Sequence, residues 1–139
     1  MNDLRLTHEL TSDQIDDLVA LYQTVWWAIG RVRADVEVML RGSLAFAFVD
    51  DAGRIAAFAR VVTDGVYKAL VFDVIVAAGH RGSGLGQQLV DAVLEHPTVR
   101  RCLHVELYCA PDLIPFYERW GFTRDLGDIT FMRRTRVTS

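Results

Sequence analysis

Apolar positions in the first forty residues recur mostly with the period of a helix. Leu4–Thr7 is short and alternating, which predicts a first strand. Thr11 and Gln14 then have the spacing of a capping box, in which the two side chains cap the first turn of a helix. Apolar residues follow at helical spacing, so we expect a helix to about Thr24 and a second, short helix over Asp35–Leu40.

The pattern changes after Ser43, where three apolar runs follow one another closely. Leu44–Val49, Ile55–Val62 and Tyr67–Val76 are rich in residues that favour strands. The connections between them contain Asp-Gly and related turn residues, which suit tight reversals of the chain. We therefore predict an antiparallel meander of three strands.

The remaining third of the chain alternates between helical and extended patterns. We expect a helix over Gly84–Glu95, a strand over Cys102–Tyr108 and a helix from Pro111 or Asp112 to Trp120. Thr130–Arg134 is predicted as a final strand. A strand that follows a helical crossover lies parallel to the strand before it, so the chain as a whole predicts one α/β domain with a mixed sheet.

Composition narrows the class of function. The chain has 139 residues, 51% of them hydrophobic, and a formal net charge of -3, which describes an ordinary globular domain. No basic face stands out, so we expect neither nucleic acid nor a membrane as partner. Cys102 and Cys109 have a spacing that turns them to opposite faces of a strand, so we expect reduced thiols and a cytoplasmic protein. The four histidines lack the spacing of a metal site, and no metal is expected.

The segment that joins the third run to the following helix carries the strongest chemical signal. It reads Arg81–Gly82–Ser83–Gly84–Leu85–Gly86. A helix N-terminus presents free backbone N–H groups and the positive end of the dipole, and glycines let a ligand approach that backbone. These residues predict a site for a phosphate or pyrophosphate, with Arg81 adding a fixed charge. A tight turn that needs glycine only for packing is the alternative.

Two motifs give the chain a family resemblance. The loop resembles the acetyl-CoA motif of the GNAT N-acetyltransferases, Arg/Gln-x-x-Gly-x-Gly/Ala, with Arg81, Gly84 and Gly86 at its fixed positions. Phe116–Phe122 is similar to the family's second signature, in which an aromatic residue and Tyr are followed, after three intervening residues, by Gly-Phe. The resemblance extends from about Ala45 to Phe122 and is weaker before it.

The resemblance implies a GNAT fold with a mixed central sheet of about six to seven strands flanked by about four helices. It implies transfer of the acetyl group of acetyl-CoA to a primary amine of a small molecule by direct attack, with no metal, and small relatives of this kind often form homodimers. The backbone amides of Val74, Ile75 and Val76 would pair with the pantetheine arm and thioester, and residues 81–86 would bind the pyrophosphate. A GNAT-fold module that binds acyl-CoA without catalysis is the alternative.

Catalysis by such a site needs groups that move protons. Tyr117 is the general acid that the resemblance implies, and its alternative role is that of a core aromatic residue. Asp73 lies in the most apolar stretch of the chain, where an acid must have a partner, solvent or a catalytic role. Both a catalytic base and a structural role remain open for it.

The acceptor pocket is the least defined part of the predicted site. Trp26, Trp27 and Phe72 are candidate contacts for the acceptor, because aromatic rings bind ammonium groups and apolar bodies. Adjacent indoles cannot both face the core from a regular helix, so one could line a pocket; a buried Trp with a partly exposed neighbour is the plainer alternative. With a single acid, Asp73, we expect a small aromatic or apolar amine as acceptor instead of a polyamine.

Overall fold

The computed structural model describes residues 3–137, and the chain divides into two compact units, Met1–Leu107 and Tyr108–Ser139. The larger unit contains one five-stranded sheet. Its strands are β1 (Arg5–Thr7), β2 (Leu44–Val49), β3 (Ile55–Thr63), β4 (Lys68–Val76) and β5 (His104–Glu106), and they lie side by side in chain order. The first four strands pair antiparallel and β5 pairs parallel to β4, which confirms the meander and the parallel crossover.

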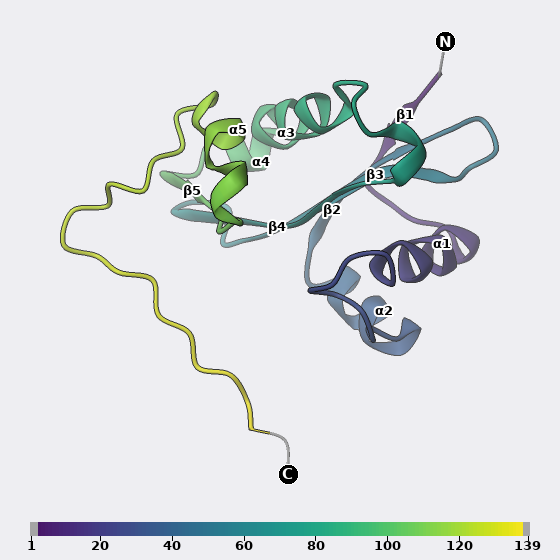
Figure 1. The fold of residues 1–139 in the computed structure, drawn as a ribbon, viewed down its shortest axis with the longest axis horizontal. Coiled ribbons are helices and arrows are strands. Elements are labelled where there is room, and N and C mark those ends of the chain that lie inside the picture. Colours follow the sequence, from purple (N-terminus) through teal and green to yellow (C-terminus); the bar gives the residue numbers. More distant parts are fainter. Residues whose placement is uncertain (1–2, 138–139) are drawn as a thin grey trace. The chain divides into compact units, whose positions relative to one another are not determined.

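Helices cover both faces of this sheet. α1 (Ser12–Tyr22) and α2 (Arg33–Arg41) lie on one face, whereas α3 (Leu85–Glu95) and α4 (Pro97–Arg100) lie on the other (Figure 1). Alternate residues of β2 divide between the two cores, because successive side chains of a strand point to opposite faces. Ala47 packs in the cluster that contains Leu18 of α1, and Phe46 packs in the cluster that contains Leu89 of α3.

Local signals in the sequence set several of these boundaries. Thr11 caps α1: its hydroxyl accepts from the Gln14 backbone N–H at 3.2 Å, and the Gln14 side chain accepts from the Thr11 backbone N–H at 2.9 Å. α3 ends at Glu95, because the following His96 is extended and precedes Pro97. No helix within residues 3–137 is long and apolar enough to cross a membrane.

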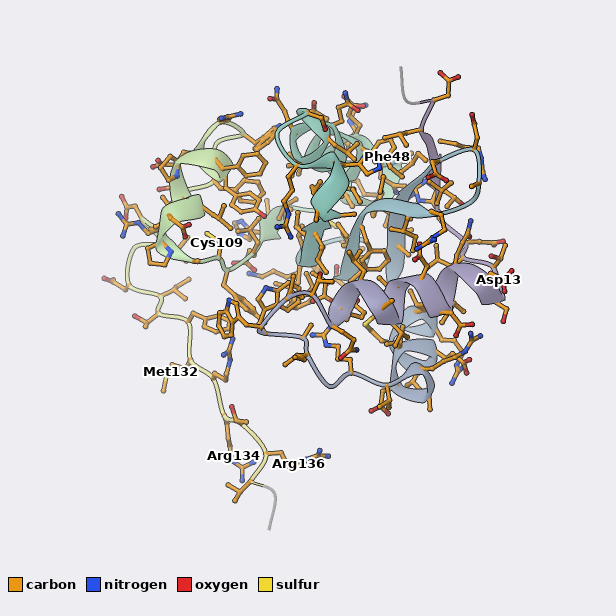
Figure 2. The ribbon with its side chains drawn as sticks, turned by 45° about the vertical axis from the view of Figure 1, so that its right-hand side comes forward. Asp13, Phe48, Cys109, Met132, Arg134 and Arg136 are labelled. Atoms are coloured by element: carbon orange, nitrogen blue, oxygen red, sulfur yellow. The ribbon has the colours of Figure 1, made fainter. Side chains whose placement is uncertain are left out.

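The smaller unit contains less regular structure. A 3₁₀ turn, η2 (Pro111–Leu113), leads into α5 (Ile114–Glu118), and Gly121 follows with a left-handed φ of 86°. The prediction of a strand over Thr130–Arg134 is wrong: that segment has no regular secondary structure and pairs with no strand within the described residues. Two of its side chains, those of Met132 and Arg134, project from the backbone (Figure 2).

The number of elements therefore differs slightly from the expectation. The described residues form five strands instead of six or seven, and five α-helices instead of four, because Pro97 starts the short additional helix α4. An apolar-polar pattern can identify a segment with strand character, but a strand is assigned only where a neighbouring strand accepts its hydrogen bonds. This explains why the final segment is misassigned by pattern alone.

Candidate active site

The glycine-rich loop connects β4 to α3 on the larger unit. A 3₁₀ turn, η1 (Ala78–His80), follows β4, and residues 81–84 then lead into the first turn of α3. Gly82 and Gly84 have φ values of 79° and 84°, a left-handed region that other residues rarely adopt. No atom lies within 4 Å of a Cβ added at either glycine, so packing does not explain why glycine stands there.

The start of α3 is arranged to receive an anion. Gly84 is the N-cap residue and provides no side-chain cap, and the first turn contains no acidic residue. The N–H groups of that turn and the positive end of the helix dipole therefore have neither a side-chain cap nor a carboxylate from the turn itself. Arg81 donates from Nε to the Val76 carbonyl at 3.2 Å, which ties this exposed guanidinium to the end of β4. The geometry supports the predicted phosphate site more than a packing turn.

A β-bulge interrupts β4 just before the residues expected to meet the pantetheine arm. The register passes from Phe58 opposite Ile75 to Arg60 opposite Phe72, so β4 has one residue more than β3 across this interval. Asp73 lies in the bulge with φ of 57°, the only positive φ among residues other than glycine in the described chain. A bulge bends the strand and redirects the side chain of the extra residue.

The carboxylate of Asp73 is the centre of a hydrogen-bond cluster. One oxygen, Oδ2, accepts from Tyr22 Oη at 2.9 Å, from Arg31 Nη1 at 2.7 Å and from Arg60 Nε at 2.6 Å. The Asp73 side chain is only 5% exposed, whereas those of Arg31 and Arg60 are 32% and 15% exposed. We call these four residues the Asp73 cluster.

The electrostatics of the Asp73 cluster disfavour a role for Asp73 as base. Burial raises the pKa of Asp73, but hydrogen bonds from Arg31 and Arg60 and their charges lower the pKa more, so the net shift is downward. Burial, followed by the Asp73 charge, raises the pKa of Tyr22 and keeps its hydroxyl protonated. A carboxylate held by two guanidinium groups accepts a proton poorly, so the structural alternative for Asp73 is favoured.

Sequence reasoning missed three members of the Asp73 cluster, namely Tyr22, Arg31 and Arg60. Arg60 interrupts the apolar run of β3 in the same way that Asp73 interrupts β4, and the two are joined across the bulge. Two opposite charges in adjacent apolar strands could therefore have indicated an ion pair between Arg60 and Asp73. Tyr22 carried no such signal, because its spacing on α1 fits a core residue equally well.

The aromatic candidates lie at different distances from the Asp73 cluster. The segment between α1 and α2 is not helical, and Trp26 and Trp27 are 85% and 41% exposed, so the alternative with one buried indole is wrong. The Arg31 guanidinium lies 5.6 Å from the Trp27 ring centroid, and that of Arg60 lies 4.8 Å from the Phe72 ring centroid. Trp27 and Phe72 thus border the cluster, whereas Trp26 makes no hydrogen bond or ring contact with it among the described residues.

The end of β4 has an open side. β5 pairs with β4 only from Lys68 to Leu70, so no other strand within residues 3–137 continues the parallel ladder beside Val74–Val76. Backbone groups on that side of the strand can bond a ligand that lies along it, as the expectation for the pantetheine arm requires. This open side lies between the bulge and the glycine-rich loop along the chain.

Tyr117 lies on α5, in the smaller unit. Its side chain is 6% exposed, and its ring lies 5.0 Å from that of Phe116 and 6.0 Å from that of Phe122. Burial, and then the nearby Cys109, raise the pKa of Tyr117 to about 12. Its hydroxyl therefore stays protonated at neutral pH, which suits a proton donor. Cys109 and Cys102 are both free thiols.

The comparisons with known proteins identify the family. The family model of the acetyltransferase (GNAT) domain matches residues 42–124. The chloroplastic GCN5-related N-acetyltransferase 1 of Arabidopsis thaliana is 31% identical over 95% of this chain and 68% of its own length. A solved GNAT acetyltransferase structure from Xanthomonas campestris pv. campestris is 32% identical, with a TM-score of 0.83, over 98% of this chain and 95% of that one.

A further relative matches a shorter segment. Serotonin N-acetyltransferase 2 of Oryza sativa subsp. japonica, also chloroplastic, is 36% identical over 53% of this chain, which corresponds to 37% of its own length. The chain belongs to the GNAT acetyltransferase family, and the family assignment made from the two motifs is confirmed.

Proposed function

We propose that this protein transfers the acetyl group of acetyl-CoA to a primary amine of a small molecule, by direct attack in a ternary complex. The observation that carries the proposal is the entry to α3, where Gly82 and Gly84 adopt left-handed conformations and leave the first turn uncapped beside Arg81. Such a site suits the pyrophosphate of CoA. The open side of Val74–Val76 gives the rest of the cofactor a backbone to bond.

The proposed chemistry follows from the groups at hand. The nitrogen lone pair of the neutral amine attacks the thioester carbonyl, the carbon–sulfur bond breaks, and the thiolate takes a proton from the Tyr117 hydroxyl. Tyr117 then regains its proton from solvent. The proton lost by the amine passes to water, because Asp73 is held by two arginines. An alkylammonium has a pKa of about 10.4, so only its neutral fraction reacts.

Two relatives support an amine as acceptor through their names. One is the rice serotonin N-acetyltransferase, and another is glucosamine 6-phosphate N-acetyltransferase 1 of the same species, 44% identical over 52 residues. Both acceptors are primary amines of small molecules. The second match covers 37% of this chain and 32% of that protein, so it supports the reaction class and leaves the acceptor of this chain to experiment.

Calorimetry with acetyl-CoA tests the cofactor site. Gly84→Asp adds a negative charge at the uncapped helix end and should weaken binding about tenfold or more, since unit charges near a protein surface interact by about 1–4 kcal/mol. Gly65→Asp is the matched control. Gly65 also has a left-handed φ, of 78°, but it lies before β4, whereas the glycine-rich loop lies after β4. Equal affinity in wild type and Gly84→Asp would exclude the loop as the pyrophosphate site.

A thiol-release assay with a panel of amines separates catalysis from binding alone. An acetyltransferase releases one CoA thiol for each amine that it acetylates. A non-catalytic acyl-CoA module binds the cofactor and releases no thiol. Binding without release by any amine on a broad panel would favour the module.

A further inference from the structure

The Asp73 cluster carries a net positive charge. Arg31 and Arg60 share one carboxylate, and the remaining member, Tyr22, is a neutral phenol. The excess is therefore one positive charge. Both guanidinium groups are partly withdrawn from solvent, so this charge is screened less than that of a surface arginine.

Arg31 is the member of the cluster that a ligand can reach. It is 32% exposed, about twice as much as Arg60, and it comes from the connection between α1 and α2. Its contacts with Asp73 and with the Met39 sulfur, at 2.7 and 4.0 Å, are both made by Nη1. A guanidinium carries five N–H donors in a fork, so donors remain for a second anion.

The surroundings of Arg31 are those of a substrate contact. The half-exposed Trp27 ring lies 5.6 Å from the guanidinium and can pack against the body of a small molecule. Asp73, to which Arg31 is bonded, immediately precedes Val74–Val76, the segment with the open side. An anion on Arg31 would therefore be held beside the bulge and next to the proposed path of the thioester.

We propose that the acceptor carries an acidic group, a carboxylate or a phosphate, in addition to its amine, and that Arg31 binds this group. The proposal rests on the proposed function. It adds an acidic group to the small aromatic or apolar amine expected from the sequence: a cationic acceptor without an acid would meet the excess positive charge, and an acidic group neutralises it. Arg31 then determines specificity, while Arg60, more buried and tied also to Ser43, positions Asp73.

The test compares amines that differ only in the acidic group. Tryptamine and tryptophan differ by a carboxylate, and glucosamine and glucosamine 6-phosphate differ by a phosphate, so the two pairs distinguish the two acids. For each we would measure kcat/KM by thiol release in wild type, Arg31→Gln and Arg33→Gln. For each amine we would compare the kcat/KM of the variant with that of wild type, so that the pKa of the amine affects both values equally.

Arg33→Gln is the matched control because Arg33 lies two residues away but is bonded to Asp16 and Glu37 instead of Asp73. We expect Arg31→Gln to lower kcat/KM for at least one acidic amine by about tenfold or more, mainly through KM, since a hydrogen bond to a charged group contributes about that factor. Its acid-free partner should change little. Arg33→Gln should leave both unchanged, and thermal unfolding would verify that each variant is folded.

The outcomes separate the two proposals. If acid-free amines are acetylated and the acidic members are not preferred, or if Arg31→Gln lowers both members of each pair equally, Arg31 only holds Asp73 and the inference is wrong. If no amine releases thiol although acetyl-CoA binds, the proposed function itself fails, and the inference fails with it.

Discussion

Tyr117 shows how burial can prepare a side chain for proton donation. An ordinary tyrosine has a pKa near 10, and burial together with Cys109 raises that of Tyr117 to about 12. A general acid acts only while it is protonated, so its activity is lost as the pH rises through its pKa. The high-pH limit set by Tyr117 should therefore lie well above the ordinary tyrosine value.

We predict that Tyr117→Phe lowers kcat by about a hundredfold or more, the usual contribution of a general acid, with little change in stability, because only the hydroxyl is removed. In wild type, kcat should show no fall as the pH passes 10, and it should still rise there with the neutral fraction of the amine, whose pKa is about 10.4. Tyr67→Phe is the control, since Tyr67 is 64% exposed on the turn before β4. Unchanged kcat in Tyr117→Phe, or a fall of wild-type kcat centred near pH 10, would argue against this role.

At the scale of the element, we expect the bulge in β4 to depend on the charge of Asp73, whose carboxylate bonds both Arg31 and Arg60. An aspartate or asparagine tolerates a left-handed φ better than most residues, so Asp73→Asn keeps the backbone while removing the charge. Two guanidinium groups would then face each other without a carboxylate. We predict that Asp73→Asn lowers the free energy of unfolding by about 2–4 kcal/mol at pH 7. The loss is smaller than for a fully buried ion pair because Arg31 is 32% exposed.

The same substitution has a defined pH dependence. The folded-state pKa of Asp73 lies below its ordinary value of 3.8, so its contribution is complete well above pH 3.8 and is lost as the pH falls through the folded pKa. Urea unfolding of wild type and Asp73→Asn should differ by a constant amount from pH 5 to 7. The difference should shrink below about pH 4. A difference that persists undiminished at pH 2 would show that charge is not the cause.

These elements also show what could be predicted from the sequence. The strand Leu44–Val49 and the start of α1 follow from local signals, namely turn residues and a capping box, and both are confirmed. The bulge at Asp73 depends on how β3 pairs with β4, and the convergence of Tyr22 and Arg31 on it depends on how the first helices cover the sheet. Such contacts join residues 42 and 51 positions apart, which no local pattern encodes.

At the scale of the whole molecule, the proposed cofactor loop and the proposed acid lie in different units. Both apolar core clusters, and the residues 81–86, belong to Met1–Leu107. Tyr117 belongs to Tyr108–Ser139. The family model spans 42–124 and so includes parts of both units. We therefore expect that the proposed pyrophosphate binding and the proposed proton donation can be separated by cutting the chain between the two units.

We predict that a fragment ending at Leu107 unfolds cooperatively and binds CoA within about tenfold of the full chain, but releases no thiol with any amine. Cooperative unfolding is expected because the fragment retains both core clusters and all five strands. Loss of turnover is expected because Tyr117 is absent. Circular dichroism measures unfolding, calorimetry measures CoA binding, and the thiol assay measures turnover. The full-length Tyr117→Phe variant is the control, because it lacks the acid but retains the smaller unit. A folded fragment that no longer binds CoA would instead place part of the cofactor site in Tyr108–Ser139.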